Sequence, residues 1–248
     1  MAGIENSVYP NSVCQITRRL RKGERALLIA AITVFLYLEW GLLSDERARW
    51  GIAAGHPFLK EVALTFDDGP RAWGMPELLS TLKSLDVPGT FFLVGKFAER
   101  HASITKNIQA GGHEIENHSY THPKLHTLWV EKMMREAERC NEVMDNLGVL
   151  TPSFLRPPGG GFNLKVFYAM RRMKMRMGLW SVNTADYTGI SARRITNVAV
   201  KMTRPGAVIL MHSGVPETVL ALPAIVTSLH QRGYRFVTLQ DLWNGGAI

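Results

Sequence analysis

The chain contains 248 residues, 46% of them hydrophobic, which is enough to bury one sizeable core with or without an appendage. Its two cysteines, Cys14 and Cys140, are far apart, which argues against a disulfide framework and against a cysteine-based metal site. The formal net charge of +8 favours a polyanionic neighbour, which can be nucleic acid, anionic lipid or an acidic cell-wall polymer.

The N-terminal region has the composition of a signal anchor. A basic cluster precedes an apolar stretch at residues 26–43, which is broken only by Glu39 and is just long enough to span a bilayer as a helix. The basic residues are Arg18, Arg19, Arg21, Lys22 and Arg25. We therefore expect a basic cytoplasmic segment at residues 1–25, a transmembrane helix at residues 26–43, a linker at residues 44–57, and the rest of the chain outside the cell. A cleaved signal peptide and a buried helix are the alternatives. An export signal argues against nucleic acid as a partner.

Strand-like and helix-like segments alternate along a single domain at residues 58–248. Strands are expected at residues 62–66, 89–94, 113–117, 154–156, 176–183, 207–211 and 235–238. Helices are expected at residues 76–85, 96–110, 128–147, 163–173, 192–202, 216–232 and 239–243. This alternation indicates parallel βαβ units, and the number of units favours a closed or nearly closed barrel over an open sheet. In such barrels the chemistry takes place at the carboxyl ends of the strands.

Reactive side chains follow five of the predicted strands. They are Asp67 and Asp68 after the first, His118 and His122 after the third, Arg156 in RPPGG after the fourth, Asp186 after the fifth, and His212 after the sixth. Barrel geometry would bring these strand ends to one face of the molecule. We therefore interpret the five clusters as one site.

The pair His118 and His122 suggests a metal site. The two histidines are four residues apart, so one helical turn would place them on the same side, where they could bind one cation. A carboxylate from another strand end would complete a His-His-Asp site with positions open for water and substrate. If Asp68 is that carboxylate, the cation neutralises its charge, and Asp67 can stay ionised beside it as a general base.

These segments resemble a known family. TFDDGP, HSYTH, RPPGG, WSVNTADY and VILMH are similar, in order and spacing, to the five motifs of the NodB-type polysaccharide deacetylases, carbohydrate esterase family 4. The resemblance extends from about residue 58 to residue 243. It implies an α/β fold, a distorted (β/α) barrel with fewer than eight complete repeats. It also implies a hydrolase that removes N-acetyl groups from N-acetylglucosamine residues of a cell-surface polysaccharide.

The resemblance implies a role for each motif residue. Asp68, His118 and His122 would bind one divalent metal ion, most often zinc, with cobalt, nickel or manganese as alternatives. Asp67 would be the general base that activates water, and His212 would protonate the departing amine.

Four further residues receive supporting roles from the resemblance. Asp186 would hold His212, and Arg156 would hold Asp67. The backbone N–H of Gly159 would stabilise the oxyanion, and Leu210 would line the pocket for the acetyl methyl group.

The sequence departs from the family pattern in two motifs. In the fourth motif, Asn183 replaces an aspartate and Tyr187 replaces a tryptophan, which leaves an aromatic groove wall but changes the local hydrogen bonding. In the third motif, Gly159 stands where many relatives carry an aromatic residue, so the groove there should be more open. Trp73, just past the first motif, can stack on a sugar ring or pack its own loop.

Several functions remain open at this stage. Peptidoglycan is the leading substrate; chitin oligomers, another exopolysaccharide, acetylated xylan and small C–N substrates are alternatives. A non-catalytic glycan-binding barrel is the alternative from another class. The stretch RRMKMR at residues 171–176 can dock an anionic wall polymer, or it can be a helix end with Met173 and Met175 packed inward. No obligate protein partner is indicated.

Overall fold

The computed structural model describes residues 51–245. The predicted basic segment, the predicted transmembrane helix and the first part of the predicted linker lie outside these residues and stay predictions. Among residues 51–245, no helix is both long and apolar enough to cross a membrane.

The strands of the described region form one sheet. They are β1 Gly51–Ile52, β2 Glu61–Gly69, β3 Thr90–Leu93, β4 Glu114–Asn117, β5 Phe154–Leu155, β6 Arg176–Gly178, β7 Val182–Asn183, β8 Ala207–His212 and β9 Arg235–Phe236. Their order is β1-β6-β5-β4-β3-β2-β8-β7, with β9 paired to β2. The paired strands run parallel, so their carboxyl ends lie at the same edge, which we call the carboxyl edge.

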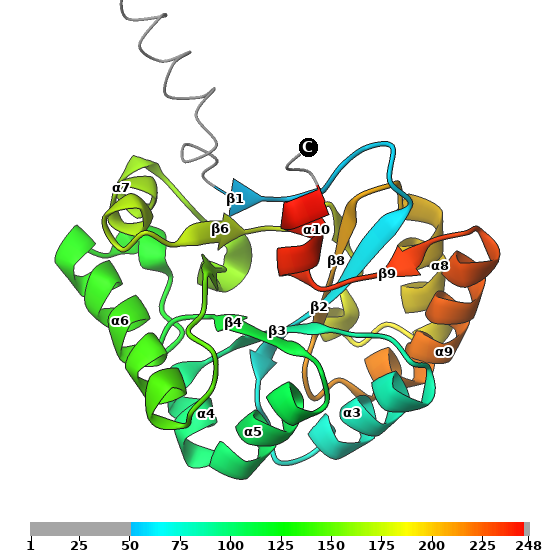
Figure 1. The fold of residues 1–248 in the computed structure, drawn as a ribbon, viewed down its shortest axis with the longest axis horizontal. Coiled ribbons are helices and arrows are strands. Elements are labelled where there is room, and N and C mark those ends of the chain that lie inside the picture. The colour runs from blue at the N-terminus through cyan, green and yellow to red at the C-terminus, as the bar shows by residue number, and fades with distance from the viewer. Residues whose placement is uncertain (1–50, 246–248) are drawn as a thin grey trace, which may run out of the picture. The chain divides into compact units, whose positions relative to one another are not determined.

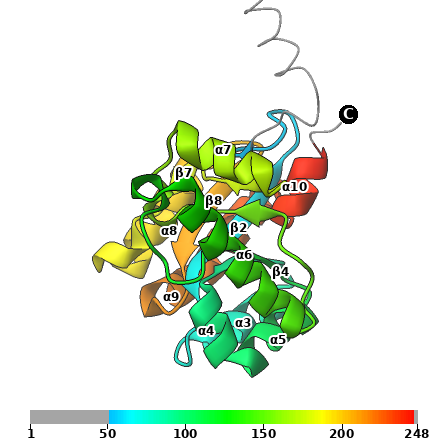
Figure 2. The same cartoon turned by 90° about the vertical axis from the view of Figure 1, so that its left-hand side faces the viewer.

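Helices cover the outer side of this sheet (Figures 1 and 2). They are α3 Met75–Ser84, α4 Gly95–Arg100, α5 Ala102–Ala110, α6 Val130–Asn146, α7 Leu164–Arg172, α8 Ala192–Met202 and α9 Pro216–Gln231. The last helix, α10 Leu239–Gly245, packs instead on the inner face of the sheet, against Ala63 and Phe92 (Figure 1). Three short 3-10 turns are η2 Leu125–Thr127, η3 Pro158–Gly160 and η4 Asp186–Thr188. The result is a parallel-strand α/β fold curved into part of a barrel, in agreement with the distorted barrel that the sequence predicts (Figure 1).

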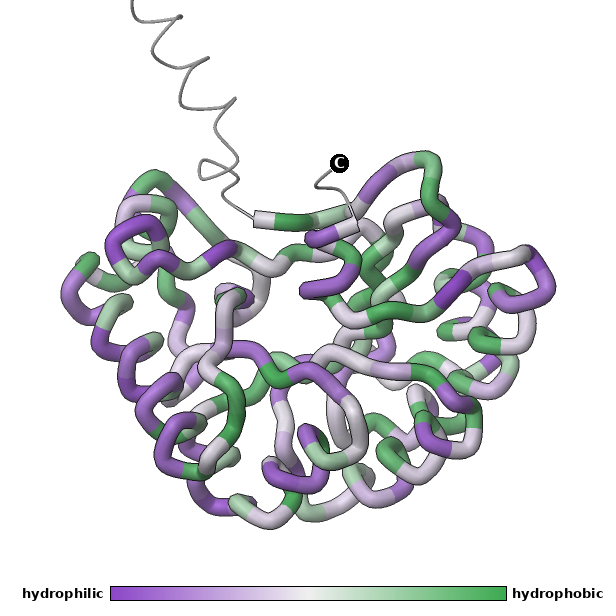
Figure 3. The backbone as a smooth tube through the Cα atoms, in the orientation of Figure 1, coloured by the Kyte–Doolittle hydropathy of each residue, from purple (hydrophilic) through white to green (hydrophobic). Residues whose placement is uncertain are grey.

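The core explains why β2 is an unbroken apolar run. Val62, Leu64 and Phe66 pack in the large cluster that contains residues of α3 and α9, whereas Ala63 packs in a second cluster with Phe92 and other residues. Both faces of β2 are therefore buried, as expected for a strand in the middle of a parallel sheet. Apolar segments accordingly run through the strands at the centre of the fold (Figure 3).

Three expected elements differ from the structure. The helix expected at residues 96–110 is two helices, because His101 has non-helical angles (φ −117°, ψ 49°). The strand expected at residues 176–183 is divided into β6, which pairs with β1 and β5, and β7, which pairs with β8. The chain between β6 and β7 thus passes from one end of the sheet toward the other, as barrel curvature requires.

The third difference concerns the start of the domain. Residues 51 and 52, within the expected linker, form β1 beside β6, and Ala54 forms a bridge with Ala207. The side chain of Ile52 is buried in the core. The compact part of the chain therefore begins before residue 58.

Candidate active site

The carboxylates Asp67 and Asp68 lie near the carboxyl end of β2, where the register of β2 with β3 shifts between Phe66 and Gly69. Asp67 stands directly opposite His212 across the β2–β8 ladder. Asp68 has φ +68°, so the two neighbouring side chains leave the strand in different directions. The Asp67 side chain is 6% exposed and that of Asp68 is 29% exposed.

Asp68, His118 and His122 bring three ligand atoms together. The Oδ1 atom of Asp68 lies 3.0 Å from Nε2 of His122 and 3.4 Å from Nε2 of His118. One ligand atom from each of the three residues lies within 4.8 Å of the other two. Ligands at zinc–nitrogen and zinc–oxygen distances in a tetrahedron are roughly 3.3 Å apart. The three residues therefore fit a small divalent cation.

The two histidines converge through a loop and not through the expected helical turn. Ser119 and His122 both have positive φ values, 63° and 66°, which a helix does not contain. Asn117 Oδ1 accepts the Ser119 N–H at 2.7 Å, and Ser119 Oγ accepts the His122 N–H at 3.1 Å. These bonds fold residues 117–122 into a compact turn that brings the rings within 4.9 Å, centroid to centroid.

The hydrogen bonds around His118 determine its tautomer. His118 Nδ1 lies 2.8 Å from the carbonyl oxygen of Arg156, which can only accept, so Nδ1 carries the proton and donates it. The lone pair of Nε2 then faces Asp68, as a metal ligand requires. Such a bond from the outer ring nitrogen is the usual support for a metal-binding histidine.

The Asp68 carboxyl is held in its ionised form. Burial by itself would raise the pKa of Asp68, but the hydrogen bonds and charges of His118 and His122 outweigh it and lower that pKa below its usual range. An ionised oxygen among imidazole nitrogens is a donor set that suits zinc and related cations.

Arg156 is fully buried and holds Asp67. Its Nη1 atom donates to Asp67 Oδ1 at 2.6 Å and to Thr65 Oγ1 at 2.9 Å. Its Nε and Nη2 atoms donate to the carbonyl oxygens of residues 178 and 179, and its guanidinium lies 3.9 Å from the ring centroid of Phe92. Oδ2 of Asp67 stays on the side of the metal-ligand cluster, 3.8 Å from His118 Nε2.

His212 is paired with a buried aspartate. Asp186 Oδ1 lies 2.8 Å from His212 Nδ1, and Asp186 Oδ2 accepts the His212 backbone N–H at 2.8 Å and the Thr218 hydroxyl at 2.6 Å. Burial would lower the pKa of His212, but the hydrogen bond and charge of Asp186 raise that pKa overall. The Asp186 carboxylate therefore favours the protonated form of His212.

The remaining predicted residues lie at the same edge. Leu210 is buried two residues before His212, on the same side of β8. The Tyr187 ring is 59% exposed and lies 4.9 Å from the His212 ring. Gly159 has φ +69° and open space where a side chain would be, as expected for an open groove. Asn183 Oδ1 accepts the Ala185 N–H, so this residue supports its own turn.

Sequence reasoning missed Thr65, Thr218 and the ring of Phe92, which support Arg156 and Asp186. Thr218 lies 32 residues from Asp186, at the start of α9, and no local signal in the sequence connects the two. Thr65 lies two residues before Asp67, and period-2 alternation of the strand could have placed both on one side.

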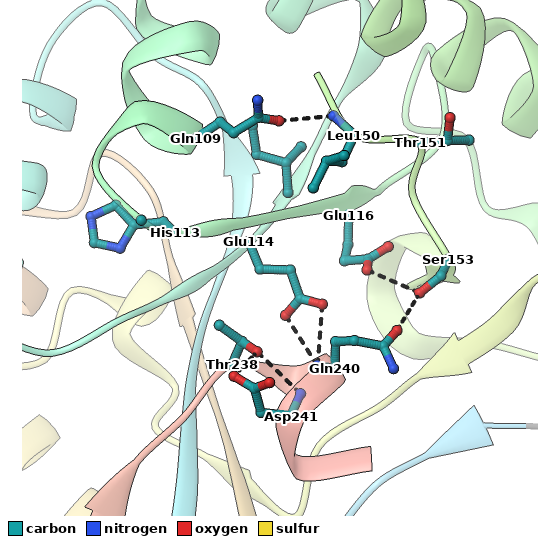
Figure 4. Close-up of a pocket in the computed structure, with 12 residues that line it drawn as sticks. Gln109, His113, Glu114, Glu116, Leu150, Thr151, Ser153, Thr238, Gln240 and Asp241 are labelled. Atoms are coloured by element: carbon teal, nitrogen blue, oxygen red, sulfur yellow. Dashed lines mark hydrogen bonds between the residues drawn. The ribbon is translucent and has the colours of Figure 1, made fainter. Parts of the chain in front are cut away.

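A cavity of about 470 Å³ lies at the opposite, amino ends of the strands (Figure 4). Glu114 accepts the N–H groups of Leu239 and Gln240, and Glu116 accepts the N–H of Phe154 (Figure 4 shows part of this network). Burial raises the pKa of both glutamates. These carboxyl groups link α10 and β5 to β4 and lie away from the carboxyl edge.

Comparison with known proteins identifies the family of this chain. Residues 56–178 match the family model described as polysaccharide deacetylase. A peptidoglycan-N-acetylglucosamine deacetylase of Bacillus cereus is 36% identical over 214 residues, covering 81% of this chain and 78% of the relative. A chitooligosaccharide deacetylase of Rhizobium leguminosarum bv. phaseoli is 32% identical, covering 81% of this chain and 93% of the relative.

The fold is also similar to that of a solved structure. The crystal structure of a CE4 family pseudoenzyme from Bacillus anthracis is 30% identical, with a TM-score of 0.74, covering 79% of this chain and 70% of that one. The chain therefore belongs to the NodB-type polysaccharide deacetylases, the hydrolases of carbohydrate esterase family 4 that act on amide bonds.

Proposed function

We propose that this protein is a metal-dependent deacetylase of the N-acetylglucosamine residues of peptidoglycan. The observation that supports the proposal is that two ion pairs lie side by side, one on β2 and one at the end of the neighbouring strand β8. Arg156–Asp67 lies on the β2 side and Asp186–His212 on the β8 side, and Asp67 and His212 are cross-strand neighbours. A base and an acid thus face the same small volume beside the metal-ligand cluster.

Asp67 is the general base in this proposal. Because Arg156 occupies Oδ1, Oδ2 is the oxygen that takes a proton from the attacking water. The water oxygen then bonds to the acetamide carbon, and the carbonyl electrons move onto its oxygen. The open backbone at Gly159 offers an N–H to that oxygen as negative charge develops.

His212 is the general acid. Its Nδ1 is bonded to Asp186, so Nε2 delivers a proton to the amide nitrogen as the C–N bond breaks. The products are acetate and a free amine on the sugar. Leu210 lies where it can bound the space for the acetyl methyl group.

Asp68, His118 and His122 would hold the divalent cation, with zinc as our first choice and cobalt, nickel or manganese as alternatives. When bound, the ion supplies Lewis acidity that polarises the carbonyl and makes water easier to deprotonate. The carbonyl oxygen of Arg156 orients the His118 ring and holds a proton on Nδ1, which leaves Nε2 for the cation.

The direct test is acetate release by the full-length chain. The protein, purified in detergent and loaded with zinc or cobalt, should release acetate and leave free amines on peptidoglycan, and a strong chelator should stop the reaction. Faster release from chitin oligomers than from peptidoglycan would assign the substrate to the chitooligosaccharide class instead.

Two variants separate the roles of the adjacent carboxylates. Asp68→Asn should lower the metal content, because a neutral amide oxygen is a poorer ligand, and excess metal should restore part of the activity. Asp67→Asn should keep its metal but lose on the order of 10²–10⁴ in turnover. Loss of metal from Asp67→Asn but not from Asp68→Asn would show that the two roles are exchanged.

A non-catalytic glycan-binding barrel is the second candidate, because one solved relative carries the name pseudoenzyme. Against it, every metal, base and acid position of this chain carries a competent residue in a supported geometry. Glycan binding with no acetate release at any metal concentration would favour that alternative.

We further propose that residues 26–43 are a retained signal anchor and that the catalytic domain is extracytoplasmic. The basic residues before this stretch support that orientation. A reporter fused to the C-terminus should be exported, and the chain should stay full length in the membrane fraction. A shortened soluble form would instead indicate a cleaved signal peptide.

A further inference from the structure

Several exposed aromatic side chains lie on the loops of the carboxyl edge, whereas Phe58, before β2, and Tyr168, in α7, are exposed elsewhere. Among residues 51–245, Trp73 and Trp129 are the exposed tryptophans, 60% and 78% exposed, and Phe162 and Tyr187 are exposed as well. Each belongs to a connection that leaves the carboxyl end of a strand: β2, β4, β5 and β7, respectively. Aromatic rings with about half or more of their surface exposed to solvent are available to contact a ligand.

Trp129 and Phe162 lie on two loops that are joined to each other. Asn163 Nδ2 donates to the carbonyl oxygen of His126 at 3.0 Å, and Lys165 Nζ donates to that of Leu128 at 3.3 Å. Lys165 Nζ also lies 5.7 Å from the ring centroid of Trp129. We call Trp129, Phe162 and Lys165 the β4–β5 platform.

The β4–β5 platform lies on the same two loops as residues of the candidate site. Trp129 follows His122 on the loop after β4, and Phe162 follows Gly159 on the loop after β5. The other exposed rings lie beyond His212: Tyr187 contacts its ring, and Trp73 lies against Gly214.

The strand order separates these two groups of rings. β5 and β4 lie on one side of β3 and β2, whereas β8 and β7 lie on the other. The metal-ligand cluster and the Asp67–His212 pair are therefore flanked by aromatic rings on both sides.

We propose that the β4–β5 platform binds the glycan strand several sugars away from the reacting acetamide, so that the enzyme acts within polymers and not only on short ends. This inference rests on the proposed function and names the form of its substrate. Sugar rings present flat C–H faces that stack on aromatic rings, and the Lys165 ammonium favours the carboxylates of an acidic wall polymer.

Trp129 can be replaced without removing a structural group. It is the residue before α6, and its side chain makes no capping hydrogen bond; only its carbonyl oxygen accepts from the helix. Trp129→Ala should therefore fold. Leu150→Ala is the matched control, because Leu150 is also 78% exposed but precedes β5 at the amino end.

The experiment compares the full-length variants on N-acetylglucosamine disaccharide and hexasaccharide and on insoluble peptidoglycan. Trp129→Ala should lower kcat/KM on the hexasaccharide by about 10-fold, the size of one aromatic contact, and lower it far less on the disaccharide. Trp129→Phe should recover most of the loss, and Leu150→Ala should match the wild type. An unchanged hexasaccharide-to-disaccharide ratio in Trp129→Ala would overturn the proposal.

Co-sedimentation with peptidoglycan decides the question without turnover. Weaker co-sedimentation of Trp129→Ala supports the platform even if the wild type releases no acetate, a result that would contradict the proposed function alone. Normal co-sedimentation of Trp129→Ala combined with loss of self-association would assign the surface to a second copy of the chain and overturn the proposal.

Discussion

Asp67 and Asp68 are chemically identical neighbours that the fold makes different. Asp67 receives an arginine on Oδ1 inside the sheet, whereas Asp68 turns outward to two histidines. The cause is local: the register shift at the end of β2 and the positive φ of Asp68 point the two side chains apart. Each carboxylate thus has its own set of polar partners, which gives the two neighbours different surroundings.

The pH dependence of the reaction should follow the Asp186–His212 pair. Because Asp186 raises the pKa of His212, the acid form persists above the ordinary histidine range, and Asp186→Asn should move the alkaline limb of kcat/KM to lower pH. The pair also contributes stability that is present below the unfolded pKa and is lost as pH rises through the higher folded pKa. The pH–rate profile is the measurement. Asp241→Asn, at an exposed position of α10, is the control that should leave the profile unchanged.

Thr218 should position this pair through its hydroxyl. Thr218→Val removes a buried donor from Asp186 while keeping the shape, which should lower kcat by roughly 5- to 100-fold, the equivalent of 1–3 kcal/mol, with KM little changed. Thr218→Ser keeps the hydroxyl and should restore kcat, although it loses a buried methyl group. Equal kcat in the Val and Ser variants would mean that Thr218 only fills space.

At the scale of elements, the candidate site residues depend on loops whose backbone angles do not occur in a regular helix or strand. The turn at residues 117–122 needs positive φ at Ser119 and His122, and η3 needs it at Gly159 and Gly160. In η3 the two glycines have different surroundings. A Cβ on Gly160 would lie 2.3 Å from the Trp180 ring, whereas a Cβ on Gly159 would meet nothing within 4 Å.

Gly160→Ala and Gly159→Ala should therefore differ in stability. Both introduce left-handed backbone strain of about 1 kcal/mol, but only Gly160→Ala must also displace Trp180, at roughly 1–3 kcal/mol more. Thermal unfolding should give a lower Tm for Gly160→Ala than for Gly159→Ala, and its near-UV circular dichroism should change. Equal Tm values would contradict the close packing of Trp180 on this turn.

At the scale of the whole molecule, β1 helps to close the curved sheet. It pairs with β6, the Gly55 N–H donates to Gly206, and Ala54 bridges to Ala207 at the start of β8. The segment thus connects β6 with β8, strands on the two sides of the sheet. Its one large buried side chain is Ile52.

A chain that starts at residue 58 should be less stable than one that starts at residue 50. Losing Ile52 and the backbone bonds of β1 should cost about 2–4 kcal/mol, which lowers Tm by roughly 5–15 °C in a domain of this size. Parallel thermal unfolding of the two chains is the measurement. The same Tm in both would show that residues 50–57 are a linker, as the sequence suggests.

The sequence by itself determined the parts that depend on local order. The alternation of apolar strands and amphipathic helices identified the parallel fold, and the ordered motifs identified the family. Such features depend on residues that are close together in the sequence, so periodicity and spacing are enough to detect them.

Only the tertiary structure decided how these residues are held. The carbonyl oxygen of Arg156 meets His118 Nδ1 across 38 residues of sequence, and Thr218 meets Asp186 across 32. The division of residues 176–183 into two strands likewise follows from pairing with distant partners, β5 on one side and β8 on the other. Such contacts form where the curved sheet brings remote segments together, and no local pattern in the chain encodes that meeting.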